Sequence, residues 1–346
     1  MTSFSMRKIL ILDVKKHISI VKYQAGVPKI VSNLGGIAIF IPLFTINAII
    51  NHWLNNSFLP VILAVASLAF FIGLRDDLVQ WRRHRITLVK IICILLVIYL
   101  GKFKISCLNG LFGIYSLSPL VAYIAAGLLV MLLVEFAESL NKITGLLPII
   151  AGYSFLIFGS AFALIKINAL ATLCFGLTGS LIGFITFQKQ HHKLTLGKAG
   201  SLLIGILLGY MSISLLCANR ITSSFSSGAS YNDILNIPLS ISFVLLPLFD
   251  IIRRILCTFV TRTRWNHNLP IPVILSRYGY KDGKIALLIG SINVILMLMI
   301  GYLRYLNLGL NIIFCLLASF CTLIMWLLFT IFPGEALDTL KQNKMS

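Results

Sequence analysis

The sequence predicts an all-α protein, a polytopic transmembrane helical bundle of about ten spans. Of its 346 residues, 58% are hydrophobic and only 11% are charged, whereas soluble domains average about 25% charged residues. Mean hydropathy is high, at +0.97. The apolar residues form blocks close to the ~20 residues that a helix needs to cross a bilayer. Because these blocks are continuously apolar and do not alternate, they predict helices and not a β-barrel.

Ten apolar blocks mark the expected spans in chain order. They cover residues 35–51, 58–74, 88–101, 119–137, 147–165, 168–186, 199–217, 234–249, 285–303 and 310–332. The loops between them differ in charge, since 24 of the 29 Lys and Arg residues fall in the set of loops that includes both ends of the chain. Loops rich in Lys and Arg stay in the cytoplasm, so we expect both termini to be cytoplasmic.

This alternation divides the chain into one membrane domain and its cytoplasmic segments. We expect a basic N-terminal segment at 1–34, a transmembrane domain at 35–332 with cytoplasmic loops at 75–90, 138–146, 187–198 and 250–284, and a cytoplasmic tail at 333–346. In a soluble protein, the net charge of +19 would suggest nucleic acid. Here the basic residues lie between the spans and indicate membrane orientation, so no nucleic-acid partner is expected. None of the seven cysteines forms a CxxC pair, so neither a disulfide framework nor a zinc site is predicted.

Two adjacent acids, Asp76 and Asp77, follow the second predicted span. Neighbouring carboxylates at a membrane boundary hold a metal, bind cationic groups or share a proton; the alternative is a solvated helix end neutralised by nearby arginines. Lys90 begins the next span and either faces the same vestibule or extends to the interface. Glu135 and Glu138 share a helix face at the end of a later span. Acids in such segments are functional candidates, although water can reach these two.

A glycine-rich segment from Gly197 to Ser201 opens the seventh predicted span. Gly197, Gly200 and Ser201 at a helix start present backbone N–H groups suited to a phosphate, and Lys198 adds a positive charge. The adjacent histidines upstream point apart on a helix or strand, which disfavours a metal there. Asp250 ends the eighth predicted span, where the alternative to a functional role is an ion pair with the arginine three residues on. The basic loop that follows is either an anion-binding surface or an orientation signal only.

Five stretches in this order carry a resemblance that runs over nearly the whole chain. They are Leu34–Phe40, Gly73–Asp77 with Lys90, Asn141–Gly145, Leu196–Gly205 and Pro247–Asp250. With them the chain resembles the polyprenyl-phosphate N-acetylhexosamine-1-phosphate transferases of glycosyltransferase family 4, which include the undecaprenyl-phosphate GlcNAc-1-phosphate transferase and the peptidoglycan translocase. The resemblance implies that Asp76 and Asp77 are catalytic. It implies substrate contacts from Lys90, Asn141, Gly145, Gly197, Lys198, Gly200, Ser201 and Asp250.

Enzymes of this family catalyse attack by a polyprenyl phosphate on the β-phosphate of a UDP-sugar. UMP leaves, and a lipid-linked pyrophosphoryl sugar remains for cell-envelope biogenesis. The chemistry uses Mg²⁺ to neutralise the pyrophosphate and carboxylates to hold the metal. The resemblance therefore implies a bacterial inner-membrane protein whose partners are polyprenyl phosphate and a UDP-sugar. It implies Mg²⁺ if the chain is active and otherwise no cofactor, and it leaves a homodimer open.

The chain departs from the family pattern at several positions, three of which replace acids. The Asn-x-x-Asp-Gly-x-Asp-Gly stretch has Thr144 and Leu147 in place of its two acids, and the Mg²⁺-binding acid of Gly-Asp-x-Gly-Ser is Lys198 here. An ammonium group ~4 Å from a cation costs about 4 kcal/mol at an effective dielectric of ~20. A metal site of the family kind is therefore not expected, and no metal ligand is assigned. The family's first span also lacks a counterpart, because only twelve residues precede Asp13; an apolar span encoded in frame upstream would place the start site earlier.

Three functions from different classes follow from these residues. The first is an active or relaxed transferase that acts through Asp76, Asp77 and Lys90, with Asp250 as a further candidate. The second is a non-catalytic member, a pseudoenzyme, which keeps the fold and a lipid-phosphate groove and in which the Lys198 ammonium holds a phosphate without metal. The third is an unrelated transporter, which predicts interrupted helices with charges at mid-membrane. A decayed gene product without function is the remaining alternative.

Overall fold

The computed structural model describes most of the first 216 residues and a helix further along the chain. The described residues are 19–24, 27–54, 58–79, 83–101, 105, 107–111, 114–191, 194–216, 248, 250, 253, 271, 273, 275, 280 and 282–305. The helices with described bounds are α2 (Gly35–Leu54), α3 (Phe58–Val79), α4 (Arg83–Gly101), α5 (Pro119–Leu140), α6 (Leu146–Leu164), α7 (Asn168–His191), α8 (Gly197–Leu216) and α12 (Asp282–Tyr305). Each overlaps a predicted apolar block, so eight of the ten blocks are confirmed as helical. The blocks at 234–249 and 310–332 lie outside the described residues, apart from Leu248.

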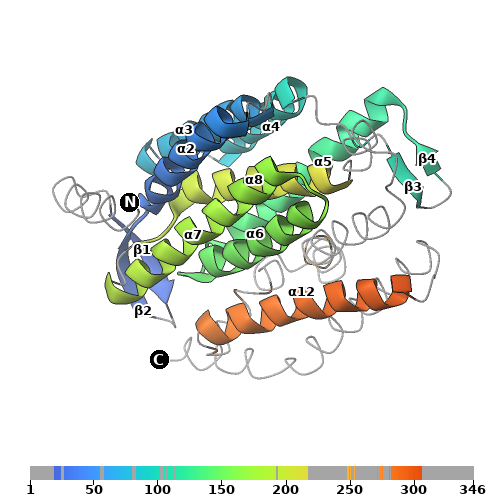
Figure 1. Ribbon diagram of the computed structural model, residues 1–346. Coiled ribbons are helices and arrows are strands. Elements are labelled where there is room, and N and C mark those ends of the chain that lie inside the picture. Colours follow the sequence, from blue (N-terminus) through green and yellow to red (C-terminus); the bar gives the residue numbers. More distant parts are fainter. Residues whose placement is uncertain are drawn as a thin grey trace.

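Two antiparallel hairpins accompany the helices. β1 (Ser19–Gln24) pairs with β2 (Val27–Ser32), and β3 (Cys107–Leu111) pairs with β4 (Ile114–Ser116). No strand was predicted in either place, so the fold class is mainly helical and not strictly all-α. The hairpins lie at opposite ends of the helical bundle (Figure 1). The sides of the membrane on which residues 1–34 and the loop before α5 lie stay a prediction.

The helix α8 forms the centre of the bundle. All its residues are buried except Lys198 in its first turn, and it packs against α2, α3, α5 and α6. A helix that is apolar on all sides needs such neighbours around it. Small residues allow their close approach: a Cβ on Gly73 of α3 would lie 2.5 Å from the Cα of Ala199, and a Cβ on Gly205 would lie 2.6 Å from the Cα of Val134 in α5. This packing fixes α3 and α5 against α8.

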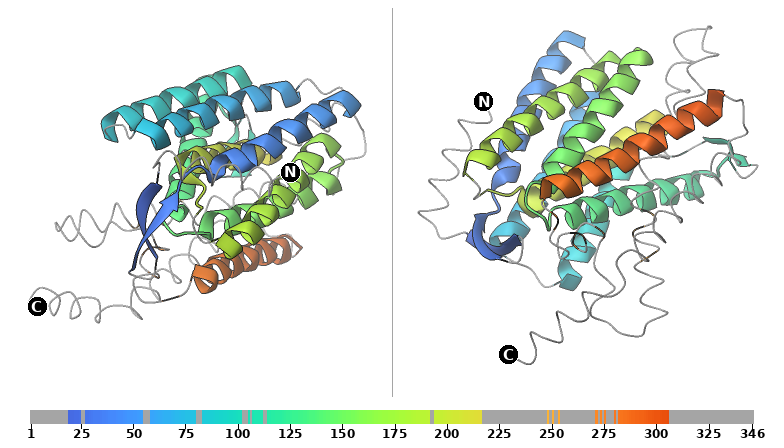
Figure 2. Two further views of the ribbon diagram at one scale, coloured as in Figure 1. Left: turned by 90° about the vertical axis from the view of Figure 1, so that its left-hand side faces the viewer. Right: turned by 90° about the horizontal axis from the view of Figure 1, so that it is seen from below.

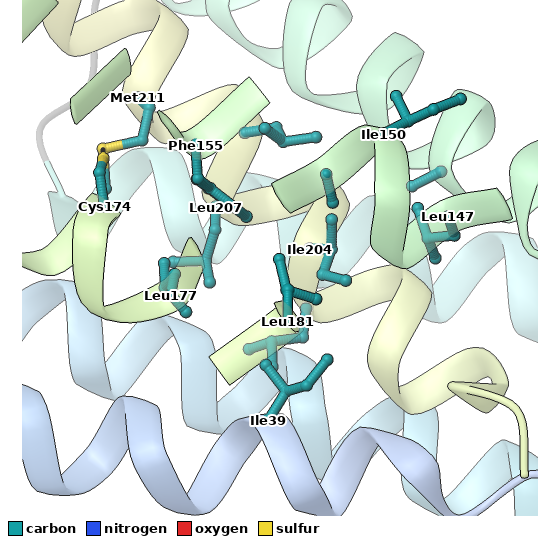
Figure 3. Packing of buried hydrophobic residues seen from close by; sticks show 14 of the residues in the cluster. Ile39, Leu147, Ile150, Phe155, Cys174, Leu177, Leu181, Ile204, Leu207 and Met211 are labelled. Atoms are coloured by element: carbon teal, nitrogen blue, oxygen red, sulfur yellow. Dashed lines mark hydrogen bonds between the residues drawn. The ribbon is translucent and has the colours of Figure 1, made fainter. Parts of the chain in front are cut away.

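The other helices form layers around this centre. α6 and α7 lie side by side, α2, α3 and α4 pack in sequence, and α12 packs against α6 (Figure 1, Figure 2). Figure 3 shows the apolar core where α2, α6, α7 and α8 meet, with Ile39, Phe155, Leu181 and Leu207 among its residues. The charged residues of α5 and α8, in contrast, lie near the end of α5 and in the first turn of α8.

Four of the described helical segments are long and apolar enough to cross a membrane. They are Pro119–Leu140, Leu146–Leu164, Asn168–Gln188 and Gly197–Leu216. Shorter apolar stretches occur at Gly35–Ile50, Thr87–Leu96 and Gly283–Ile292. The chain is an integral membrane protein, and the total of about ten spans stays a prediction.

Candidate functional site

Asp77, at the end of α3, caps the start of α8. Its carboxylate accepts hydrogen bonds from the backbone N–H groups of Lys198 (2.9 Å) and Ala199 (2.8 Å). N–H groups in the first turn have no partner within their own helix, and the partial positive charge of a helix start favours an anion. The sequence pattern suggested a phosphate for these groups. In the structure, the carboxylate of Asp77 binds two of them.

The environment of Asp77 combines burial with this capping. Asp77 lies beyond the predicted span 58–74 and is only 4% exposed. Burial raises the pKa of Asp77 from its ordinary 3.8 to about 6, while the two backbone N–H donors and the Lys198 ammonium act in the lowering direction. At neutral pH the carboxylate is therefore mostly ionised and remains the acceptor for the start of α8.

Asp76 forms an ion pair with Lys198, the residue whose backbone N–H donates to Asp77. Its Oδ2 lies 2.7 Å from Nζ of Lys198. The side chain of Asp76 is 7% exposed and that of Lys198 is 45% exposed. The ion pair thus joins a buried carboxylate to an ammonium group that reaches the surface.

Lys90, in α4, pairs with acids of α5. Its Nζ forms a salt bridge with Glu138 and lies 3.8 Å from Oε1 of Glu135. The structure confirms that both acids are on one helix face, the face toward Lys90. The Lys90 side chain is 10% exposed, so this pair is a mostly buried connection between α4 and α5.

Hydrogen bonds also hold the segment that leads into α8. Asn141, just after α5, donates from Nδ2 to the carbonyl oxygen of Gly197 (2.7 Å). The hydroxyl of Thr195 donates to Oδ1 of Asn33 (2.8 Å), and the first two N–H groups of α2 donate to carbonyl oxygens of the same segment. These hydrogen bonds fix the backbone of the segment that contains Lys198.

Three other predicted site residues have local structural roles. Gly145 starts α6 with φ of +85°, a conformation that favours glycine. Gly200 packs so closely on α2 that a Cβ on Gly36 would lie 2.6 Å from its nitrogen. Ser201 is fully buried, and its hydroxyl donates to the carbonyl oxygen of Lys198 (3.1 Å). Substrate contacts from Gly145, Gly200 and Ser201 stay predictions.

The charged groups meet in one pocket between α3, α4, α5 and α8. Its lining residues are Ile72, Gly73, Asp76, Val89, Lys90, Glu138, Lys198 and Leu202. Asp76, Lys90 and Lys198, which the sequence analysis singled out, therefore line the same pocket. Asp77 and Asn141 bind the backbone at the adjoining start of α8. We call this the charged pocket.

Asp250 is not among the described residues that line the charged pocket. It is 1% exposed, and its Oδ1 accepts hydrogen bonds from Nη2 of Arg253 (3.1 Å) and from the backbone N–H of Ile271 (3.2 Å). The ion pair that the sequence offered as the alternative role of Asp250 is confirmed. A substrate contact from Asp250 stays a prediction.

The carboxylates of the charged pocket do not fit a divalent-cation site of the family kind. Mg²⁺ prefers an octahedral shell of oxygen ligands, whereas Oδ2 of Asp76 already lies 2.7 Å from an ammonium group. Within the part of the chain that the structure describes, no three His, Cys, Asp or Glu side chains are grouped to hold a metal. The positive charge beside Asp76 comes from Lys198.

The fold and the pocket define an integral membrane protein with a charged pocket at one end of its helical bundle. Comparison with known proteins shows which family this region resembles. Residues 59–216, which contain every residue that lines the pocket, match the profile of Glycosyl transferase family 4. The match confirms the resemblance found in the sequence motifs.

Curated relatives carry the name phospho-N-acetylmuramoyl-pentapeptide-transferase. The chain is 28% identical to one from Prochlorococcus marinus (strain MIT 9301) over 228 residues, which are 61% of this chain and 62% of the relative. A second, from Prochlorococcus marinus subsp. pastoris, is 25% identical over 291 residues, 80% of this chain and 77% of the relative. One from Listeria welshimeri is 34% identical over 85 residues, 23% of this chain and 26% of the relative. The match to the first relative thus spans less than two thirds of its length.

Sequence reasoning missed the groups that fix the charged pocket. Thr195 and Asn33 are 162 positions apart, and Gln188, whose Nε2 donates to the carbonyl oxygen of Leu194 (2.7 Å), belongs to no motif. Glu138 was noted, but its pairing with Lys90, 48 positions away, has no local signal. A search for opposite charges at the adjoining ends of consecutive spans would have found that pair.

Proposed function

We propose that this chain is a lipid-phosphate-binding protein of the bacterial inner membrane, built on the fold of its transferase family, in which Lys198 contacts the phosphate of polyprenyl phosphate in place of a divalent cation. The observation that carries this proposal is the ion pair between Lys198 and Asp76. In this family, as the motif resemblance implies, an acid that binds Mg²⁺ stands at the position of Lys198. Here a fixed cation occupies that place.

The geometry around Lys198 suits contact with an anion. An ammonium group carries three N–H donors, and the contact with Asp76 uses one of them. The side chain is nearly half exposed, while its backbone is fixed by Asp77 and Asn141. Charge-assisted hydrogen bonds to phosphate oxygens are stronger than neutral ones, so a phosphate can bind Lys198 while the ion pair persists.

The proposal includes the predicted topology. With about ten spans, both termini in the cytoplasm and the domain limits given above, the charged pocket lies at the inner headgroup level, where a polyprenyl phosphate presents its phosphate. The placement of β1–β2 and β3–β4 at opposite ends of the bundle supports this arrangement.

A second candidate function is the transferase reaction of the family. One observation favours it: Asp76, Lys90 and Lys198 line one pocket, and Asp77 and Asn141 adjoin it. In that reaction a polyprenyl phosphate attacks the β-phosphate of a UDP-HexNAc and UMP leaves. No step is derived through Mg²⁺, since the pocket's donor set does not fit it.

Binding of polyprenyl phosphate to the purified full-length protein tests the first proposal. Lys198→Met removes the charge and keeps an unbranched side chain, and we expect it to weaken binding about tenfold or more, the value of one charge-assisted hydrogen bond. Lys284→Ala, an exposed lysine of α12, is the matched control and should bind like the wild type. Equal affinities for the wild type and Lys198→Met would refute the proposal.

Acceptor-dependent release of UMP separates the two candidates. Wild-type protein, polyprenyl phosphate, a panel of UDP-HexNAc donors and Mg²⁺ are combined, with Asp76→Asn as the control. Protein that binds the lipid and releases no UMP supports the non-catalytic function. UMP release that Asp76→Asn abolishes would establish the transferase instead.

A further inference from the structure

The charged pocket contains both signs of charge in equal number. Lys90 and Lys198 supply two positive charges, and Asp76 and Glu138 supply two negative ones. Each lysine pairs with an acid, Lys198 with Asp76 and Lys90 with Glu138. The formal charge of these four lining residues is therefore zero, and Glu135, 3.8 Å from Lys90, adds a negative charge nearby.

This balance of charges favours a phosphate ligand that also carries a positive charge. A phosphate monoester carries about −1.5 to −2 charges at pH 7. A phosphate on Lys198 by itself leaves the accessible carboxylates Glu138 and Glu135 without a contact to the ligand. A ligand that carries a cation beside its phosphate can contact the lysine and the carboxylates at once.

The exposed groups of the pocket, together with the adjoining Glu135, indicate how such a ligand would be placed. The Lys198 side chain is 45% exposed, Glu135 is 39% and Glu138 is 24%. The partners Asp76 and Lys90 are only 7% and 10% exposed. A ligand that approaches from the surface therefore meets one accessible cation on α8 and two accessible carboxylates on α5.

We propose that the charged pocket takes a lipid phosphate ester that also carries a primary amine, with the phosphate on Lys198 and the ammonium group on Glu138 and Glu135. This inference rests on the proposed function and narrows its ligand. Two lipid sources share this chemistry, a polyprenyl phosphate esterified with an amino alcohol or amino sugar, and a phosphatidylethanolamine. Both present an ammonium group a few bonds from a phosphate.

Three matched probes test the inference on the full-length protein. They are polyprenyl phosphate, its 2-aminoethyl ester and the N-acetylated form of that ester, which keeps the phosphodiester and removes the positive charge. We expect the aminoethyl ester to bind about tenfold more tightly than its N-acetylated form, the value of one charge-assisted hydrogen bond. Phosphatidylethanolamine against phosphatidylglycerol repeats the comparison on a glycerolipid and shows whether the pocket also requires the polyprenyl chain.

Two variants test whether Glu135 and Glu138 cause the preference for the aminoethyl ester. Glu135→Gln and Glu138→Gln should each bring the affinity ratio of the aminoethyl and N-acetylated esters toward one. Glu135→Gln serves even if Glu138→Gln fails to fold, because Glu135 is the more exposed acid. A ratio near one in the wild type, with binding of all three probes lost in Lys198→Met, would overturn the inference and leave the proposed function standing. Binding that Lys198→Met does not affect would overturn both.

Discussion

Two lysines line the charged pocket, and their surroundings differ. Lys90 is 10% exposed and connects α4 to acids of α5, whereas Lys198 is 45% exposed and contacts one buried acid of α3. The lysine that water hardly reaches stabilises the packing of two helices. The lysine at the surface is the one that an arriving anion can contact. Position in the fold, and not residue type, therefore separates the structural lysine from the one that we propose contacts the ligand.

The interactions that hold the two lysines in place also differ. Lys90 depends on ion pairs between side chains. The backbone N–H of Lys198 donates to the carboxylate of Asp77, and the carbonyl oxygen of its neighbour Gly197 accepts from Asn141. The position of the Lys198 side chain therefore does not depend on its ion pair alone. Changes that disturb the backbone at α8, the Lys90 pair or the Asp77 cap should therefore have separable effects.

The largest effect is expected at the backbone under Lys198. Gly197 has φ of +69°, and a Cβ there would lie 2.0 Å from the carbonyl oxygen of Asn33. Gly197→Ala should lower the stability by about 3 kcal/mol or more, since it adds a clash to a strained conformation. Thermal unfolding in detergent measures this. Gly179→Ala is the matched control, because a Cβ at Gly179 meets nothing within 4 Å; similar losses in both variants would contradict the role of Gly197.

Removing the charge of Lys90 should have the next largest effect. Lys90→Met leaves Glu138 without its cation, and we expect a loss of about 2 kcal/mol, below the range for fully buried pairs because Glu138 is 24% exposed. The double variant Lys90→Met/Glu138→Gln should recover part of it. A double-variant cycle of unfolding measurements gives the coupling, and additive losses would show that the two side chains do not interact.

The cap at the start of α8 should contribute less. Asp77→Ala removes the acceptor of two backbone N–H groups, and loss of such a cap costs about 1 kcal/mol. Asp77→Asn keeps one side-chain oxygen and should cost less than Asp77→Ala. Unfolding measurements on the two variants test the order, and an Asp77→Ala variant as stable as the wild type would argue against the cap.

The smallest effect is expected from a change that keeps the charge. Lys198→Arg should alter stability by about 0.5 kcal/mol or less, as is usual for exposed substitutions. It should also retain lipid-phosphate binding within about threefold, because guanidinium groups bind phosphate well. The affinities of Lys198→Arg and Lys198→Met for polyprenyl phosphate are measured side by side. If both variants lose binding equally, the charge of residue 198 is not what the phosphate contacts.

Much of the helical framework could be predicted because local composition determines it. The block predicted at 119–137 is the helix Pro119–Leu140, and the block at 199–217 is Gly197–Leu216. Continuous apolar stretches of this length favour helices wherever they occur. The hairpin of β1 and β2 was missed, since residues 19–32 show no clear alternation of polar and apolar side chains.

The candidate site could be predicted only in part. The motifs identified Asp76, Asp77, Lys90 and Lys198, but the contacts among them depend on which helices pack together. Asp77 and the Lys198 backbone are 121 positions apart, and no local pattern reports that α3 lies beside α8. The two acids therefore looked alike in the sequence, whereas in the structure one caps a helix and the other pairs with an ammonium group.

The most direct test of the account is the metal dependence of lipid binding. The affinity of the full-length protein for polyprenyl phosphate is measured in Mg²⁺ and again in excess EDTA. If Lys198 supplies the charge at the phosphate, the two affinities agree and Lys198→Met weakens both. If EDTA abolishes binding by the wild type, a metal ion supplies that charge and the central claim is wrong.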